Sequence, residues 1–114
     1  LRALRQIADV KVALGTFSTD DAAELLEKTV PMDRATALAE AVEMSEWPGQ
    51  KISYQTGKLQ IEQMMSDARK VQGERFNLRK FHDYVWLNGN VPFALQRWEY
   101  LGTDDELKKL NELK

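Results

Sequence analysis

Cysteine is absent from the sequence, and histidine occurs once, as His82. The lack of thiols excludes disulfides, thiolate metal sites and cysteine nucleophiles. A conventional zinc site takes three or four protein ligands, usually with more than one His or Cys among them. We therefore expect no complete metal site within this chain, and neither specific zinc binding nor peptide cleavage by the chain alone.

Two further features are missing, a basic run and a long apolar run. The net charge is −2 at pH 7, and Lys and Arg form no cluster in the sequence. The chain therefore lacks the electrostatic footprint of a protein that binds nucleic acid or an anionic membrane. No apolar stretch approaches the roughly 18 residues that a transmembrane helix needs. We expect no nucleic-acid partner and no membrane span, and the composition leaves the compartment open.

Strand signals are also missing, and helical patterns fill the sequence instead. No segment alternates cleanly between polar and apolar residues, and there is no internal repeat. We predict an all-α fold, with a single helical domain of six or seven helices around one long helix, over residues 1–102. Residues 103–114 are expected to form a tail with a short marginal helix.

The predicted helices begin at capping residues and end at Gly or before Pro. Ser18 with Asp21 resembles a capping box, and Asp33 and Asn77 are suited to cap the helices that follow them. The expected helices cover residues 1–14, 19–30, 34–47, 49–71, 78–87 and 92–101.

The first predicted helix has an apolar surface wide enough for burial on more than one side. Arg5 and Asp9 are four residues apart and can pair, which gives Asp9 a solvated or salt-bridged edge position. Because the chain opens inside this helix, we expect it to be a piece of a longer protein whose other part carries the targeting signals. The exposed apolar face is expected to contact that missing N-terminal part or to support self-association.

The long helix predicted for residues 49–71 carries a stripe that changes character along its length. The C-terminal part of the stripe is apolar or small, and its N-terminal part consists of Gln50, Tyr54 and Gly57. Spacings of three and four place these residues on one face. The Tyr54 phenol either bonds a main-chain carbonyl internally or donates to a bound ligand. Gly57 is expected to let another helix or a substrate lie close.

His82 lies on the helix predicted for residues 78–87. A single His on a partly apolar face is usually structural and hydrogen-bonded through one ring nitrogen. The other interpretation is a proton donor or a substrate contact. Asp83 beside it suits a surface or capping role.

Several spaced motifs resemble one family. They occur in the same order and at matching distances in the C-terminal part of the bacterial proteins called domain of unknown function 885. The motifs are Trp47-Pro48-Gly49-Gln50, Ser53-Tyr54, Gly57-Lys58, Phe81-His82-Asp83, Gly89 and Pro92.

The family resembles zinc peptidases of the HExxH type. The resemblance implies that an upstream helix of the parent protein carries HExxH, that zinc is bound there, and that the parent is an exported or periplasmic protein. The present chain would then be the C-terminal segment of a zinc metallopeptidase and form part of the substrate-cleft wall. Within it, the resemblance implies Tyr54 as oxyanion donor and Gln50 as a hydrogen-bonding contact to a peptide substrate, with His82 as a further catalytic candidate.

The chain departs from the commoner family pattern at two places. Many members have Arg-Tyr where this chain has Glu43-Met44, and many have a His near the position of Ala13. These departures put the parent's specificity and activity in question. The alternative function is a non-catalytic helical binding or scaffold domain.

Overall fold

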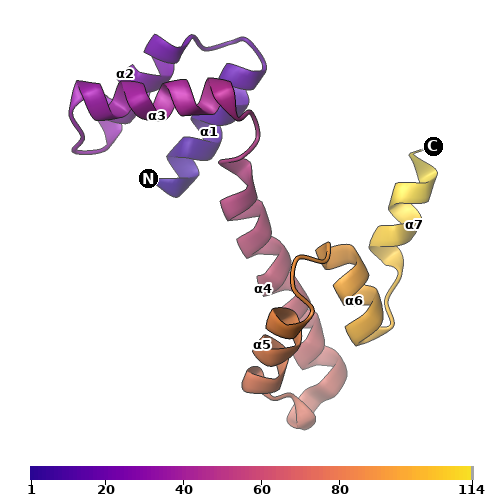
Figure 1. Cartoon of the computed structure of the whole chain (residues 1–114). Coiled ribbons are helices and arrows are strands. Elements are labelled where there is room, and N and C mark those ends of the chain that lie inside the picture. Colours follow the sequence, from indigo (N-terminus) through magenta and orange to yellow (C-terminus); the bar gives the residue numbers. More distant parts are fainter. Residues whose placement is uncertain (114) are drawn as a thin grey trace. The chain divides into compact units, whose positions relative to one another are not determined.

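The computed structural model describes residues 1–113, and these residues form helices and connecting turns with no strand (Figure 1). The all-α prediction is confirmed. The described part contains seven α-helices and one 3-10 turn: α1 (Arg2–Ala13), α2 (Thr19–Thr29), α3 (Arg34–Glu46), α4 (Ile52–Gln72), η1 (Gly73–Arg75), α5 (Leu78–Leu87), α6 (Phe93–Leu101) and α7 (Asp105–Glu112). Within residues 1–113, none of the helices is both long and apolar enough to cross a membrane.

The chain divides into two compact units. The first covers Leu1–Lys58 and the second Leu59–Lys114. Helix α4 begins in the first unit and continues into the second.

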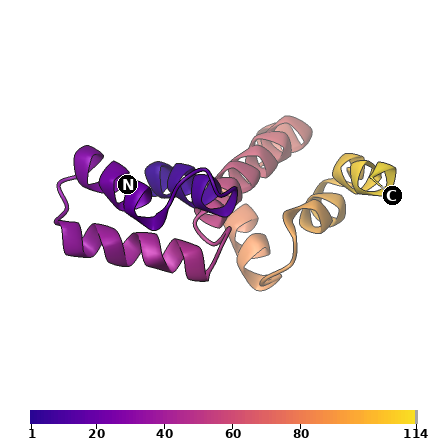
Figure 2. The ribbon, with the colours of Figure 1, turned by 90° about the horizontal axis from the view of Figure 1, so that it is seen from above.

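The first unit is built from α1, α2 and α3, with α2 and α3 packed side by side (Figures 1 and 2). Its buried core is dominated by alanine, which lets helix backbones approach closely. The fully buried apolar residues are Ala8, Ala22, Ala23, Leu26, Ala37, Ala41 and Met44.

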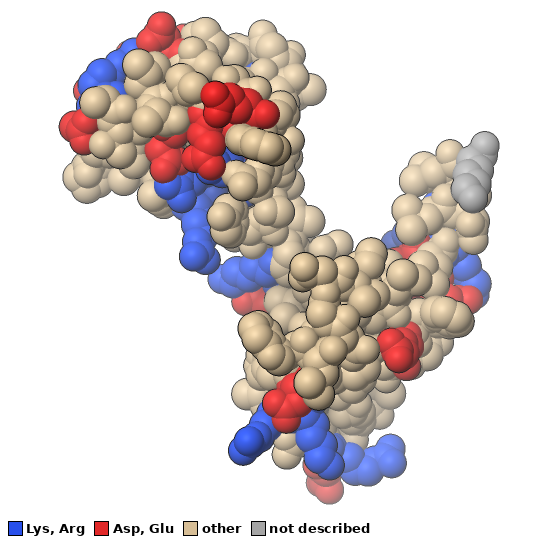
Figure 3. Space-filling model, in the orientation of Figure 1, with Lys and Arg blue, Asp and Glu red and all other residues tan. Residues whose placement is uncertain are grey.

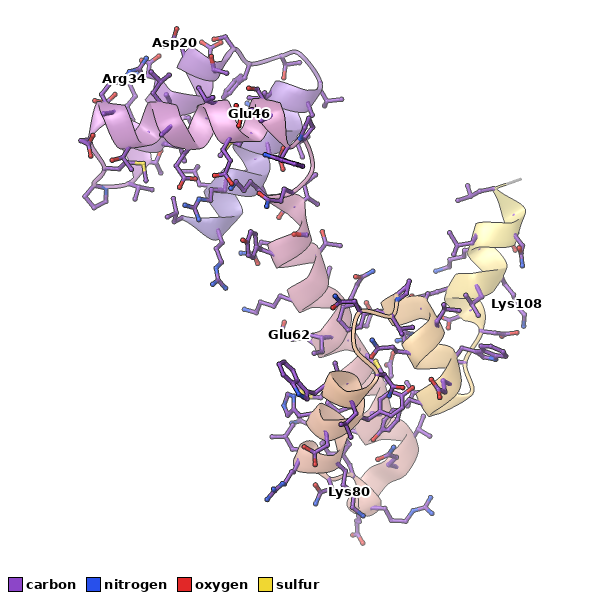
Figure 4. The ribbon with its side chains drawn as sticks, in the orientation of Figure 1. Asp20, Arg34, Glu46, Glu62, Lys80 and Lys108 are labelled. Carbon is purple, nitrogen blue, oxygen red and sulfur yellow. The ribbon has the colours of Figure 1, made fainter. Side chains whose placement is uncertain are left out.

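Ion pairs join the helices of the first unit. Arg34 at the start of α3 bonds Asp20 at the start of α2 over 2.6 Å, and both are labelled in Figure 4. Arg5 of α1 pairs with Glu40 of α3. The expected pairing of Arg5 with Asp9 is therefore wrong, because Arg5 reaches across to another helix.

The second unit packs the C-terminal part of α4 with α5 and α6 around aromatic side chains. Met64, Ala68 and Phe81 are fully buried, and Tyr100 meets Phe81 edge-on at 5.9 Å. Edge-on ring contacts add stabilisation beyond the area that they bury.

A buried arginine fastens α7 to this unit. Arg97 of α6 is 6% exposed and pairs with Asp67 of α4 at 2.6 Å, with Asp105 at 3.5 Å and with Glu106 at 3.3 Å. The short helix expected in the tail thus forms, and its first turn is fixed by these ion pairs.

The predicted caps are confirmed, whereas the start of the long helix is wrong. Ser18 and Asp21 form a capping box, and the side chains of Asp33 and Asn77 accept from main-chain N–H groups of α3 and α5. Helix α4 begins at Ile52 rather than at residue 49. Gly49 has a φ of +84°, outside the right-handed helical region, so the helix cannot include this residue.

Candidate functional site

A buried carboxylate fixes the turn between α3 and α4. Asp9 of α1 is fully buried. Its Oδ1 accepts from the Gly49 N–H at 2.9 Å, and its Oδ2 accepts from the Lys51 N–H at 2.9 Å. Both carboxylate oxygens are thus bonded to the stretch that leads into α4. Charge-assisted bonds of this kind are about twice as strong as neutral ones.

The position of Asp9 corrects the interpretation of that residue as a solvated or salt-bridged edge. It is buried beside the line of Leu4, Ala8 and Val12, which packs against the core of the first unit, whereas Ile7 and Leu14 of the other apolar line are exposed. No local signal identified this role, because the partners of Asp9 lie 40 and 42 residues later in the chain. An acidic residue there needs partners when it is buried, and the turn after Pro48 supplies them.

A second contact holds the same turn. The Lys51 ammonium bonds Glu43 of α3 at 2.8 Å, and the Lys51 side chain is 6% exposed. Gly49 adopts a φ of +84°, a conformation that residues with a side chain rarely adopt. The Pro-Gly-Gln turn is therefore defined by sequence at Gly49 and by contacts from both α1 and α3.

Gln50 lies in this turn and not in the helix. Its main-chain carbonyl accepts from the Ser53 hydroxyl at 2.6 Å and from the Ser53 N–H at 3.3 Å, which links the turn to the start of α4. The Gln50 side chain is exposed and makes no hydrogen bond with any part of residues 1–113. The predicted helical stripe is therefore interrupted at its first member, although Gln50 and Tyr54 both belong to the first unit.

Tyr54 occupies the first turn of α4. Its side chain is 48% exposed, and its hydroxyl bonds no group in the described part of the chain. The Arg2 guanidinium lies 5.6 Å from the centre of the Tyr54 ring. A phenol with an unused O–H suits a developing negative charge on a ligand oxygen.

The second unit contains an open hollow of about 760 Å³ beside His82. Figure 3 shows mostly uncharged side chains over α5 and α6. The hollow is lined from α4, α5, α6 and the α5–α6 loop by Ile61, His82, Asp83, Val85, Trp86, Gly89, Asn90, Val91, Phe93 and Gln96.

His82 is exposed, and its ring meets Phe81 edge-on at 5.6 Å. Its ring nitrogens make no hydrogen bond with residues 1–113, so the hydrogen-bonded structural role is not what this unit shows. Asp83 pairs weakly with Arg79 at 4.0 Å on the surface, in line with the surface role expected for it. His82 and Tyr54 belong to different units.

The Tyr84 side chain links α5 to α6. Its hydroxyl donates to the Glu99 carboxylate at 2.9 Å. Burial, followed by this bond to Glu99, raises the pKa of the Tyr84 phenol to about 12. The two phenols therefore differ, because the Tyr84 hydroxyl is hydrogen-bonded within its unit and the Tyr54 hydroxyl is not.

A sequence profile of the family described as "Bacterial protein of unknown function (DUF885)" matches residues 1–98. The chain belongs to this family. The match covers Asp9, the turn that it fixes, Tyr54 and the hollow beside His82. No curated protein and no solved structure matches the chain. The DUF885 assignment carries no activity by itself.

Residues 1–113 contain no group of three or more His, Cys, Asp or Glu arranged to hold a metal ion. The donor set of this segment therefore does not fit the zinc that the peptidase resemblance implies.

Proposed function

We propose that this chain is the C-terminal segment of a metallopeptidase-like DUF885 protein and forms part of its substrate-cleft wall. Tyr54 donates a hydrogen bond to the oxyanion that forms at the scissile carbonyl, and Gln50 binds the main chain of the peptide. The observation that supports this proposal is the turn held by Asp9, after which the side chains of Gln50 and Tyr54 make no internal hydrogen bond.

The bonds of the turn hold its main chain in one conformation. Burying a carboxylate is costly unless it is well bonded, and Asp9 uses both oxygens on the Gly49 and Lys51 N–H groups. An oxyanion donor must be held in place before the charge develops, since only then does it lower the barrier without reorganisation. A turn fixed from α1 and α3 satisfies this requirement for the residues that follow it.

The proposal assigns the metal and the general base to the rest of the parent protein, because this segment lacks the ligands. His82 stays a candidate proton donor or substrate contact. No step of the proposal depends on it, since it belongs to the second unit.

The test is Tyr54→Phe in the full-length parent protein, assayed on a peptide library with mass-spectrometric detection of cleavage. We expect turnover to fall by roughly a hundredfold or more, the usual effect of removing one oxyanion donor. The melting temperature should stay unchanged, because the Tyr54 hydroxyl bonds nothing in the segment.

Tyr84→Phe is the matched control. It removes a hydroxyl that is bonded to Glu99 and should cost about 1 kcal/mol of stability while leaving turnover unchanged. A Tyr54→Phe protein that cleaves peptides at the full rate and melts several degrees lower would end the catalytic assignment.

The second candidate is a non-catalytic binding domain, favoured by the open apolar hollow of the second unit. The two candidates differ in the sequence that precedes this segment in its parent. An HExxH motif with a later Glu supports the peptidase, and a parent without it supports the binding domain.

A further inference from the structure

Gln96 leaves a buried acceptor unused. Gln96 is among the residues that line the hollow, and it is 2% exposed. Its Nε2 donates to the Val91 carbonyl at 2.8 Å, which identifies the other amide atom, Oε1, as the acceptor. Oε1 is buried and receives no hydrogen bond from residues 1–113. Buried acceptors without a donor destabilise a fold, so this amide points to a donor that comes from outside the chain.

The charge around the hollow also favours a donor. The lining residues include the Asp83 carboxylate and no Lys or Arg. The cation near Asp83 is Arg79 at 4.0 Å, with a side chain that is 91% exposed, and such a pair contributes little. A cationic ligand could therefore replace Arg79 at low cost.

Apolar and aromatic side chains supply the rest of the surface. Ile61, Val85 and Phe93 are partly buried around the aromatic core and line the hollow. Trp86 also lines it and is 85% exposed, so that an indole face is open to a cation. The volume of about 760 Å³ lies within the range of small-molecule sites.

We propose that this hollow binds a hydrophobic primary amine. The apolar body packs against Ile61, Val85 and Phe93, and the ammonium donates to Gln96 Oε1 and to the Asp83 carboxylate. Oε1 is covered by its neighbours in the free chain, so binding includes a side-chain rearrangement at that point, as is common on complex formation. The site lies within the second unit and does not depend on the peptidase proposal.

Phenethylamine and hydrocinnamate test the proposal, since they share an aryl-alkyl body and carry opposite charges. His82 is the only histidine of the sequence, so its ring protons give an unambiguous NMR signal from the rim of the hollow. Titrations of the 114-residue chain at pH 8 should move that signal with a dissociation constant of roughly 1 mM or below for phenethylamine. Hydrocinnamate should bind at least tenfold more weakly.

Two tryptophan variants form a matched pair. Trp86→Leu removes the aromatic face beside the hollow and should weaken phenethylamine binding about fivefold. Trp98→Leu alters another exposed indole, which is not among the residues that line this hollow, and should leave the affinity unchanged.

Gln96→Met removes the unused acceptor and should weaken binding tenfold or more, provided that circular dichroism shows a folded chain. If it does not fold, Asp83→Asn at the exposed rim replaces it, with an expected loss of about threefold. The proposal is overturned if hydrocinnamate binds as tightly as phenethylamine, if the His82 signal does not move, or if the two tryptophan variants behave alike.

Discussion

In the first unit the buried carboxylate of Asp9 uses both oxygens on main-chain donors, whereas in the second unit the buried amide of Gln96 leaves its oxygen without a donor. The cores differ as well, with alanine dominating the first and aromatic rings the second. Small side chains let the helices of the first unit close on one another. Large rings in the second unit accompany an open hollow. The first unit is therefore organised around a fixed turn, and the second around an aromatic core with an open hollow.

The largest expected effect is that of Asp9→Ala on the first unit. The change leaves the N–H groups of Gly49 and Lys51 without their acceptor, so the free energy of unfolding should fall by about 3 kcal/mol. Urea denaturation of the chain, followed by circular dichroism, measures it. The control is Asp20→Ala, which removes an exposed ion pair with Arg34 and should cost less than about 1 kcal/mol. Equal losses in the two variants would show that the hydrogen bonds of Asp9 do not stabilise the turn.

The matching test in the second unit is Arg97→Met. Arg97 is buried among Asp67, Asp105 and Glu106, and its removal should cost roughly 2–4 kcal/mol and free α7. Arg79→Met is the control, because its ion pair is long and exposed. If Arg97→Met were as mild as Arg79→Met, the ion pairs would not be what fastens α7.

The same arginine predicts an acid dependence. The hydrogen bond from Arg97 holds the pKa of Asp67 below its usual value of 3.8. The folded state therefore binds this proton less readily than the unfolded state does. The stability that the pair contributes is present above pH 4 and is lost as the pH falls through the lowered pKa. Unfolding curves between pH 5 and pH 2 should show a shallower decline for Arg97→Met than for the natural chain.

The smallest effect concerns Gly57, which was expected to let a helix or a substrate lie close. A Cβ added there meets no atom within 4 Å, so packing against another helix of the chain does not explain the glycine. Gly57→Ala should stabilise α4 by about 0.5–1 kcal/mol, measured by thermal melting. If the cleft proposal holds, the same variant of the parent protein should lose peptide affinity. A stabilised variant with unaltered peptide affinity would show that Gly57 does not lie against the bound substrate.

The helices and their caps could be predicted from local sequence, because Ser18, Asp33 and Asn77 act on residues only three positions away. The start of α4 could not, since it depends on Asp9, which lies 40 residues before Gly49. The motif around Tyr54 indicated an exposed phenol among its alternatives, but nothing local distinguished it from a buried one. Gln96 carried no signal at all, because an unused acceptor is defined by surrounding residues from other helices.

The hydrogen bonds to Asp9 also control how fast two amide protons of the turn exchange with solvent. The Gly49 and Lys51 amide protons are shielded by a side chain from α1, so they can exchange with solvent only when α1 leaves its place. Hydrogen-exchange rates at these two amides should therefore match those of α1 rather than those of the surrounding turn. The exchange rates of two amides in a connecting segment thus report how often α1, which lies about 40 residues earlier in the chain, separates from the turn.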